Sequence, residues 1–195
     1  MRRARAALLA LLLTGLVAGC SSGGADDVVG SSPRTDVASV ETDLQPCPAQ
    51  TGESAAGSGV PQVRLDCFGG GSLDFRKASG VPTVVNLWAS WCGPCREELP
   101  LVQQLAIAAG DRVRVLTVDS QDGIPQATSF AADAGVTLPT AYDGQGQVAA
   151  DLGLRGLPQT VFLAPDGSVA FVQVSAVTSL EEFESLVAQH LGVQL

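Results

Sequence analysis

The stretch NLWASWCGPCREELP, residues 86–100, contains two cysteines separated by Gly and Pro. It overlaps an apolar run at 83–88 that is rich in β-branched residues, which indicates a buried strand. Residues 94–109 then show helical spacing of apolar side chains, so the first cysteine lies at a helix N-terminus. The positive end of a helix favours a thiolate and lowers a cysteine pKa from about 8.5 toward about 7 or below. The pattern predicts a redox-active pair in which Cys92 attacks a disulfide and Cys95, deeper in the first turn, resolves the intermediate.

This cysteine pair has two alternative interpretations, a purely structural disulfide and half of a zinc site. The chain has no second CxxC motif, and His190 is its only histidine, which argues against zinc. A strand followed by a helix is the setting in which the motif carries redox chemistry, which argues against a structural bridge. We expect no metal and no cofactor other than the Cys92–Cys95 disulfide.

The rest of the pattern predicts alternating strands and helices. Residues 63–75 indicate a hairpin, and a turn signal at 165–167 indicates a second, antiparallel one. Besides the strand at 83–88, further strands are expected at 113–118, 160–163 and 169–174. Helices are expected at 94–109, kinked at Pro100, at 125–134, at 147–152 and from Ser179, which forms a capping box with Glu182. This order predicts an α/β fold with a mixed central sheet flanked by helices and an N-terminal hairpin extension.

The N-terminus has the organisation of an export signal. Three Arg, an apolar run too short to span a bilayer and a small-residue end describe a signal peptide. Residues 17–20, VAGC, resemble the bacterial lipobox, in which cleavage precedes a cysteine that is then lipid-modified. The alternative is an ordinary signal peptide cut near Ala18, with Cys20 an idle thiol. The sequence predicts lipidation of Cys20 and an extracytoplasmic protein anchored to the cell membrane.

Three segments are therefore expected: a signal peptide at 1–19, a lipidated cysteine and flexible linker at 20–46, and one domain at 47–195. The chain has 20 Asp and Glu against 11 Lys and Arg, a formal net charge of −9. Removing the signal peptide leaves 8 basic residues against 20 acidic ones, a net charge of −12. Such a surface repels phosphates, which argues against nucleic-acid binding.

Two cysteines, Cys47 and Cys67, remain once Cys20 and the redox pair are assigned. Because two cysteines are left over in an oxidising compartment, a structural disulfide between them is favoured. Closing a loop of about 20 residues would stabilise the domain by about 3 kcal/mol. Free thiols or metal ligands are the weaker alternative, because no second Cys or His is near either residue in the sequence.

Residues 86–100 resemble the active-site segment of the thioredoxin superfamily. Within it they are most similar to the TlpA/ResA-like branch of secreted or membrane-anchored thiol-disulfide oxidoreductases. The resemblance covers about residues 63–195 and implies a thioredoxin-like fold. Residues 156–160 resemble the cis-proline loop of this family, which implies that Pro158 faces the disulfide and that the Leu157 backbone pairs with an extended substrate. A plain proline at the start of a strand is the alternative.

The same resemblance assigns roles to residues around the cysteines. It implies that Trp88 packs in the core, that Trp91 partly covers Cys92, and that Gly93 and Pro94 contribute with Trp91 to substrate binding. It also implies an extra helix and strand between Gln121 and Tyr142 that are typical of this branch.

One departure from thioredoxin is informative. Thioredoxin has a buried Asp where this chain has Asn86, and Asn cannot exchange a proton. In the ResA-like branch a Glu three residues after the second cysteine lies near the active site, and Glu98 occupies that position. The resemblance implies that Glu98 is partly buried, has a raised pKa and relays a proton to Cys95. A solvated helix Glu is the alternative.

The resemblance implies a thiol-disulfide oxidoreductase that acts on protein dithiols and disulfides. It suggests a reductase, kept reduced by a membrane electron donor, that reduces apocytochrome c thiols before haem attachment. The sequence leaves open an oxidase of the same fold, because the direction depends on the reduction potential. A peroxiredoxin-type peroxidase and a non-catalytic peptide-binding lipoprotein are the remaining alternatives.

Overall fold

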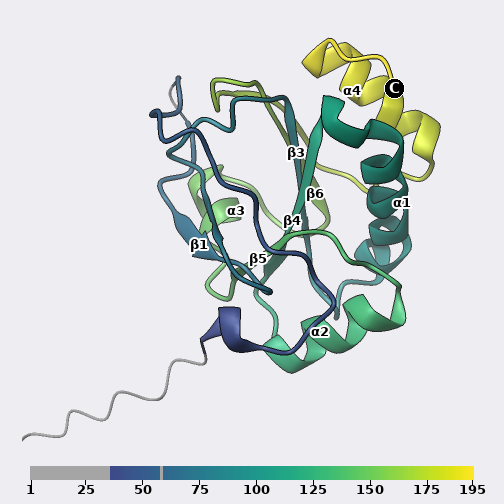
Figure 1. Cartoon of the computed structure of the whole chain (residues 1–195). Coiled ribbons are helices and arrows are strands. Elements are labelled where there is room, and N and C mark those ends of the chain that lie inside the picture. The colour runs from purple at the N-terminus through teal and green to yellow at the C-terminus, as the bar shows by residue number, and fades with distance from the viewer. Residues whose placement is uncertain (1–35, 58) are drawn as a thin grey trace, which may run out of the picture. The chain divides into compact units, whose positions relative to one another are not determined.

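A mixed sheet of five strands runs through the part of the chain that the computed structural model describes, residues 36–57 and 59–195 (Figure 1). The strand order is β5-β4-β3-β6-β7. β3 is parallel to β4, β4 is parallel to β5, and β6 is antiparallel to both β3 and β7. The strands are β3 Thr83–Trp88, β4 Arg114–Ser120, β5 Thr140–Asp143, β6 Gln159–Leu163 and β7 Val169–Gln173. The predicted mixed α/β sheet is confirmed.

Two hydrophobic cores lie on opposite faces of this sheet, because successive side chains of a strand point to opposite sides. Val84 and Trp88 of the fully buried β3 belong to the first core, which three helices cover. These helices are α1 Gly93–Ala109, α2 Ile124–Asp133 and α4 Leu180–Leu191. Asn86 lies on the same face, since it is two residues from each of these neighbours.

Val85 and Leu87 belong to the second core. This face is covered by the short helix α3 Gln147–Asp151 and by an antiparallel hairpin of β1 Arg64–Asp66 and β2 Ser72–Asp74. Figure 1 shows β1 and α3 on one side of the sheet and α1 and α4 on the other. Helices therefore lie on both faces as predicted, although the hairpin extension supplies much of the second cover.

Local sequence explains where the two long helices begin. The side chain of Cys92 caps α1, and the helix continues through Pro100 to Ala109. At α4 the Ser179 hydroxyl accepts a hydrogen bond from the Glu182 N–H at 3.2 Å. The Glu182 carboxylate accepts from the N–H of Thr178 at 3.0 Å, one residue before the position that a capping box requires.

The strand predicted at 113–118 is longer in the structure and ends at Ser120. Its last two residues are polar but buried, because β5 pairs beside them in the register Asp119↔Tyr142 and Ser120↔Asp143. α2 and β5 are the helix and strand that the family resemblance implied between residues 121 and 142.

The folded part of the chain begins earlier than the sequence indicated. The linker was expected to extend to residue 46, yet Val37 and Leu44 are buried in the first core. Val37 lies in a short 3-10 helix, η1 Val37–Ser39, and the N–H of Gln45 donates to the carbonyl of Thr137 at 3.0 Å. The segment 36–46 is thus packed against the domain, and this part of the linker prediction is wrong because its few apolar residues find a place in the core.

The disulfide between Cys47 and Cys67 ties this N-terminal segment to the hairpin, with a Cα–Cα distance of 6.0 Å. Gly71 permits the close approach: it has φ +76°, and a Cβ there would collide with the carbonyl oxygen of Cys47. A second 3-10 turn, η2 Gly110–Arg112, follows α1.

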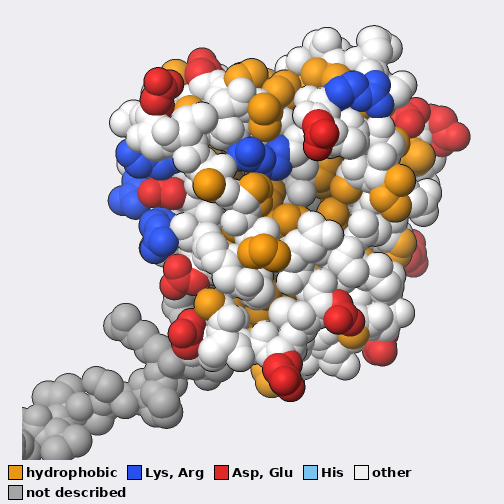
Figure 2. Space-filling view, viewed as in Figure 1, with side chains coloured by type: hydrophobic (Ala, Val, Ile, Leu, Met, Phe, Trp, Pro, Cys, Tyr) orange, Lys and Arg blue, Asp and Glu red, His pale blue; other side chains and the backbone are white. Residues whose placement is uncertain are grey.

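The predicted signal peptide, Cys20 and residues 20–35 of the linker lie outside the described residues. Among the residues that are described, no helix has the length and apolar character needed to cross a membrane. Figure 2 shows acidic side chains spread over one face of the molecule among neutral ones, with fewer Lys and Arg side chains between them.

Candidate active site

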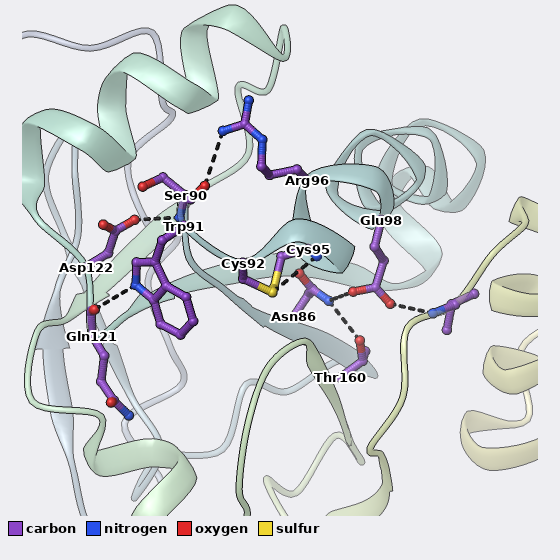
Figure 3. Close-up of a disulfide and its surroundings, with 11 residues drawn as sticks. Asn86, Ser90, Trp91, Cys92, Cys95, Arg96, Glu98, Gln121, Asp122 and Thr160 are labelled. Carbon is purple, nitrogen blue, oxygen red and sulfur yellow. Dashed lines mark hydrogen bonds between the residues drawn. A yellow bond between two sulfur atoms is a disulfide. The ribbon is translucent and has the colours of Figure 1, made fainter.

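Cys92 and Cys95 lie at the junction between β3 and α1 and form a disulfide with a Cα–Cα distance of 5.3 Å (Figure 3). β3 ends at Trp88, and a three-residue turn brings Cys92 to the N-cap position of the helix. Cys95 is completely buried, whereas Cys92 retains 5% of its surface. The outer sulfur is therefore the one that a substrate reaches first.

The backbone around Cys92 favours negative charge on its sulfur. The Cys95 N–H donates to Cys92 Sγ at 3.2 Å. This N–H belongs to the first turn of α1, where backbone donors have no intrahelical partner and the helix dipole is positive. Pro94 lies in the same turn, where its missing N–H removes no helical hydrogen bond. The arrangement suits a thiolate nucleophile at Cys92.

The two tryptophans have the different environments that the resemblance implied. Trp88 is fully buried and packs against Phe130, with ring centroids 5.6 Å apart. Trp91 is 61% exposed beside Cys92, and its indole N–H donates to the carbonyl oxygen of Gln121 at 3.0 Å. Gly93 is also exposed, so Trp91 and the start of α1 present an accessible surface around the disulfide.

The Leu157–Pro158 peptide bond is cis, as the resemblance implied. β6 begins at the next residue, and Gln159 pairs with Leu87 of β3. This register brings the loop with Pro158 to the end of the sheet where β3 turns toward Cys92. Pro158 is buried and Leu157 is half-buried.

Glu98 is buried behind the disulfide, with 1% of its surface exposed, so the alternative of a solvated Glu is wrong. It lies one helical turn after Cys95 and therefore on the same face of α1. Its carboxylate accepts from Asn86 Nδ2 at 2.9 Å and from the Val177 N–H at 2.8 Å (Figure 3). The Asn86 amide also donates to Thr160 Oγ1 at 2.9 Å.

Burial raises the pKa of Glu98 above its usual value, and the charge of Glu182 acts in the same direction. The hydrogen bonds from Val177 and Asn86 oppose this effect, because they stabilise the ionised form. A raised pKa makes the Glu98 carboxylate a better proton acceptor than an ordinary Glu, which is the property that a proton relay requires.

One part of the site, the loop that follows β4, could not be recognised from the sequence. The carboxylate of Asp122 accepts from the Ser90 N–H at 2.6 Å, in the turn just before Cys92. On the other side of this turn, the Arg96 guanidinium donates to the Ser90 carbonyl at 3.2 Å and lies 4.3 Å from the centre of the Phe130 ring. The contacts of Asp122 with Ser90 and of Phe130 with Arg96 join residues more than 30 positions apart, so only the strand order brings them together.

Cys47 and Cys67 are joined in the second core, as the sequence predicted. Within the described ranges, no group of three or more His, Cys, Asp or Glu side chains is arranged to hold a metal ion. His190 of α4 stacks on Phe171, with ring centroids 3.8 Å apart.

A protein-family model described as Redoxin matches residues 55–189. The chain belongs to the Redoxin family. It is 30% identical over 133 residues to the thiol:disulfide interchange protein DsbE of Vibrio cholerae, which covers 67% of this chain and 71% of that protein. It is 28% identical over 138 residues to the thiol-disulfide oxidoreductase ResA of Geobacillus thermodenitrificans, which covers 70% of this chain and 76% of the relative.

Solved structures agree with these relatives. The structure of MTB dsbF in its mixed oxidized and reduced forms superposes with a TM-score of 0.60 at 25% identity, covering 69% of this chain and 98% of that one. These findings confirm the thioredoxin-like fold and the TlpA/ResA-like branch. This Redoxin-family protein is therefore a thiol-disulfide oxidoreductase, and such enzymes react through a cysteine pair without a bound cofactor.

Proposed function

We propose that the protein is a lipid-anchored, extracytoplasmic reductase of protein disulfides. The observation that carries the redox part is the position of Cys92 at the N-cap of α1, with the Cys95 N–H directed at its sulfur. The anchoring part is supported by the lipobox at residues 17–20.

In the proposed reaction the reduced enzyme supplies two electrons. The Cys92 thiolate attacks one sulfur of a substrate disulfide, the substrate S–S bond breaks, and the released substrate thiolate takes a proton. Cys95 then loses its proton and attacks Cys92 Sγ, which releases the second substrate thiol and leaves the Cys92–Cys95 disulfide. A dithiol donor in the membrane restores the reduced pair by the reverse exchange.

Glu98 is proposed to accept the proton of Cys95 in the second step. The group is buried on the same helix face, and burial raises its pKa. Because Asn86 carries no proton that it can exchange, Glu98 takes the part that a buried Asp has in thioredoxin, and Asn86 holds the carboxylate in place.

The substrate is proposed to bind as an extended segment along the Leu157 backbone, beside Trp91, Gly93 and Pro94. Trp91 supports this assignment because most of its surface is exposed although its indole is fixed. An exposed aromatic ring next to a reactive sulfur offers apolar contact to many different sequences.

The direction of electron flow is proposed from the Gly-Pro pair between the cysteines, which matches the reducing thioredoxins. Potentials in the superfamily range from about −270 mV for thioredoxin to about −120 mV for a strong oxidase. The family resemblance makes apocytochrome c before haem attachment the proposed substrate.

The test is to equilibrate the full-length protein, purified in detergent, with glutathione buffers of defined potential. The redox state of Cys92 and Cys95 is read by alkylation and mass spectrometry, with a Cys47→Ala/Cys67→Ala variant to show that the second disulfide does not contribute. A potential below about −200 mV is expected, and one above about −180 mV would identify an oxidase instead. A Cys95→Ser variant should accumulate mixed disulfides with its substrates, and a Cys20→Ala variant should leave the membrane fraction.

A further inference from the structure

The turn before Cys92 is held by hydrogen bonds on both sides (Figure 3). The Ser90 N–H donates to the carboxylate of Asp122, and the Ser90 carbonyl accepts from Arg96. The next residue, Trp91, donates its indole N–H to the Gln121 carbonyl. Two of these three contacts come from the loop after β4, so this loop determines where the turn and its tryptophan lie.

The loop after β4 is itself fixed in place. Gln121 has φ +56°, a left-handed conformation that non-glycine residues seldom adopt, and it directs its carbonyl at Trp91. The Tyr142 hydroxyl donates to the Asp122 carbonyl at 3.1 Å. The second oxygen of the Asp122 carboxylate accepts from the Gly123 N–H at 2.8 Å, which leaves the first oxygen for Ser90.

A second carboxyl group, that of Asp119, is completely buried behind this loop at the end of β4. Neither of its oxygens has a hydrogen-bond donor among the residues that the structure describes. The carboxyl of Asp122, three residues further along the chain, is within hydrogen-bond reach of Asp119 and is also an acceptor. A hydrogen bond between two carboxyl groups forms only when one of them carries a proton.

The other groups around Asp119 do not supply a positive charge. From β5, Tyr142 is paired with Asp119 in register, and the next residue, Asp143, adds a nearby negative charge from the opposite face of the strand. The Asp143 carboxylate is occupied by the N–H groups of Gln147 and Val148 at the start of α3. From β3, the neighbour in register is Trp88, whose buried indole N–H is neutral and has no hydrogen-bond partner among the described residues.

We propose that Asp119 and Asp122 share one proton, and that Asp119 is a positioning residue that keeps Asp122 bonded to Ser90 and so fixes the turn in front of Cys92. The inference rests on the proposed function in one respect, that Cys92 is the attacking thiol. Burial, followed by the charges of Asp122 and Asp143, raises the pKa of Asp119 to about 8. The shared proton is therefore retained at neutral pH and lost in mildly alkaline solution.

Loss of this proton has a defined consequence for the reaction. Above pH 8 the buried Asp119 anion and the half-buried Asp122 anion repel each other, which draws Asp122 away from Ser90 and releases the turn that carries Trp91. The added negative charge also disfavours a thiolate at Cys92. Losing the hydrogen bond between Asp122 and Ser90 should change the equilibrium between the held and the released turn by about threefold to tenfold. The attack by Cys92 should therefore be slower by that factor above pH 8.

The experiment measures how fast Cys92 of the reduced, full-length protein is alkylated by iodoacetamide between pH 5 and pH 10, with the modified residue identified by mass spectrometry. The wild-type rate should show two titrations, that of the thiol and a second one near pH 8. Asp119→Asn keeps a donor toward Asp122 at every pH, so this variant should show the thiol titration alone and react about threefold to tenfold faster than wild type at pH 9.

Asp111→Asn is the matched control, because it removes one exposed carboxylate at the far end of α1 and should keep the wild-type profile. Superimposable profiles of wild type and Asp119→Asn, or the same change in the control, would overturn the proposal. If Asp119→Asn does not fold, Asp122→Asn decides: it retains an oxygen for Ser90 but no charge, and survival of the titration near pH 8 refutes the shared proton. Failure of the proposed function looks different, since Cys92 would then be labelled no faster than Cys95 at any pH.

Discussion

Replacing Asp119 by asparagine should also change how the free energy of unfolding depends on pH, by an amount that follows from the structure. The carboxyl is completely buried, and its pKa is about 8 in the folded protein against a reference value of 3.8. The folded state therefore binds the proton more tightly than the unfolded state. This contribution to stability is fully present below pH 3.8 and is lost progressively as the pH rises to about 8.

Each pH unit within this window changes the free energy of unfolding by about 1.4 kcal/mol. Between pH 5 and pH 7 the wild-type protein should therefore lose about 3 kcal/mol through Asp119, a large share of the roughly 5–15 kcal/mol that stabilises a typical domain. The Asp119→Asn variant lacks this group, so the difference between the two proteins should change by the same amount in favour of the variant.

Urea denaturation of both proteins at pH 5, 6 and 7, with both disulfides oxidised, measures this difference directly. Asp111→Asn, which alters the net charge equally at an exposed position, should run parallel to wild type. A constant difference between wild type and Asp119→Asn across the three pH values would show that Asp119 is ionised in the folded protein, and the reasoning about its buried, shared proton would then be refuted.

Replacing Cys47 and Cys67 together by alanine should lower the free energy of unfolding in urea by about 3 kcal/mol, because their disulfide spans 20 residues of the chain. A loss below about 1 kcal/mol would contradict this chain-entropy argument. Glu98→Gln removes a buried carboxyl with a raised pKa, so its free energy of unfolding should fall less than that of wild type as the pH rises from 5 to 8. In stopped-flow measurements the same variant should resolve mixed disulfides more slowly, and an unchanged rate would exclude Glu98 as the relay. Asn86→Asp replaces the amide that donates to Glu98 by an acid, and we expect it to destabilise the protein by about 1–3 kcal/mol at pH 7 and by less at pH 5. Equal losses at both pH values would indicate a packing defect rather than two competing carboxyl groups.

Sequence patterns were sufficient for the elements whose side chains are uniformly buried or regularly spaced. The run at 83–88 became β3 with all six residues buried, and the cysteine pair lies at the helix N-terminus where its spacing placed it. Local apolar pattern and helix-capping preference act within a few residues, so they can be recognised without the fold.

The contacts that could not be predicted join distant parts of the chain. Glu98 is bonded to the N–H of Val177, which is 79 residues away, and nothing in either local sequence indicates the partner. Val37 and Leu44 have neighbours rich in Ser, Asp and Thr, which describe a linker by composition, yet these two side chains fill space in the first core. Composition describes the average polarity of a segment, whereas a few apolar side chains decide whether the segment packs against the domain.

The two disulfides belong to the cores on opposite faces of the sheet: Cys92 and Cys95 lie in the first and Cys47 and Cys67 in the second. In an enzyme whose reaction is disulfide exchange, a second disulfide would be reduced if the enzyme's own nucleophile could reach it. Exchange requires a thiolate to reach the far sulfur directly. One five-stranded sheet and its buried side chains lie between the two pairs. The catalytic cysteines can therefore alternate between dithiol and disulfide while the Cys47–Cys67 disulfide stays oxidised. The sheet thus protects the enzyme from acting on itself.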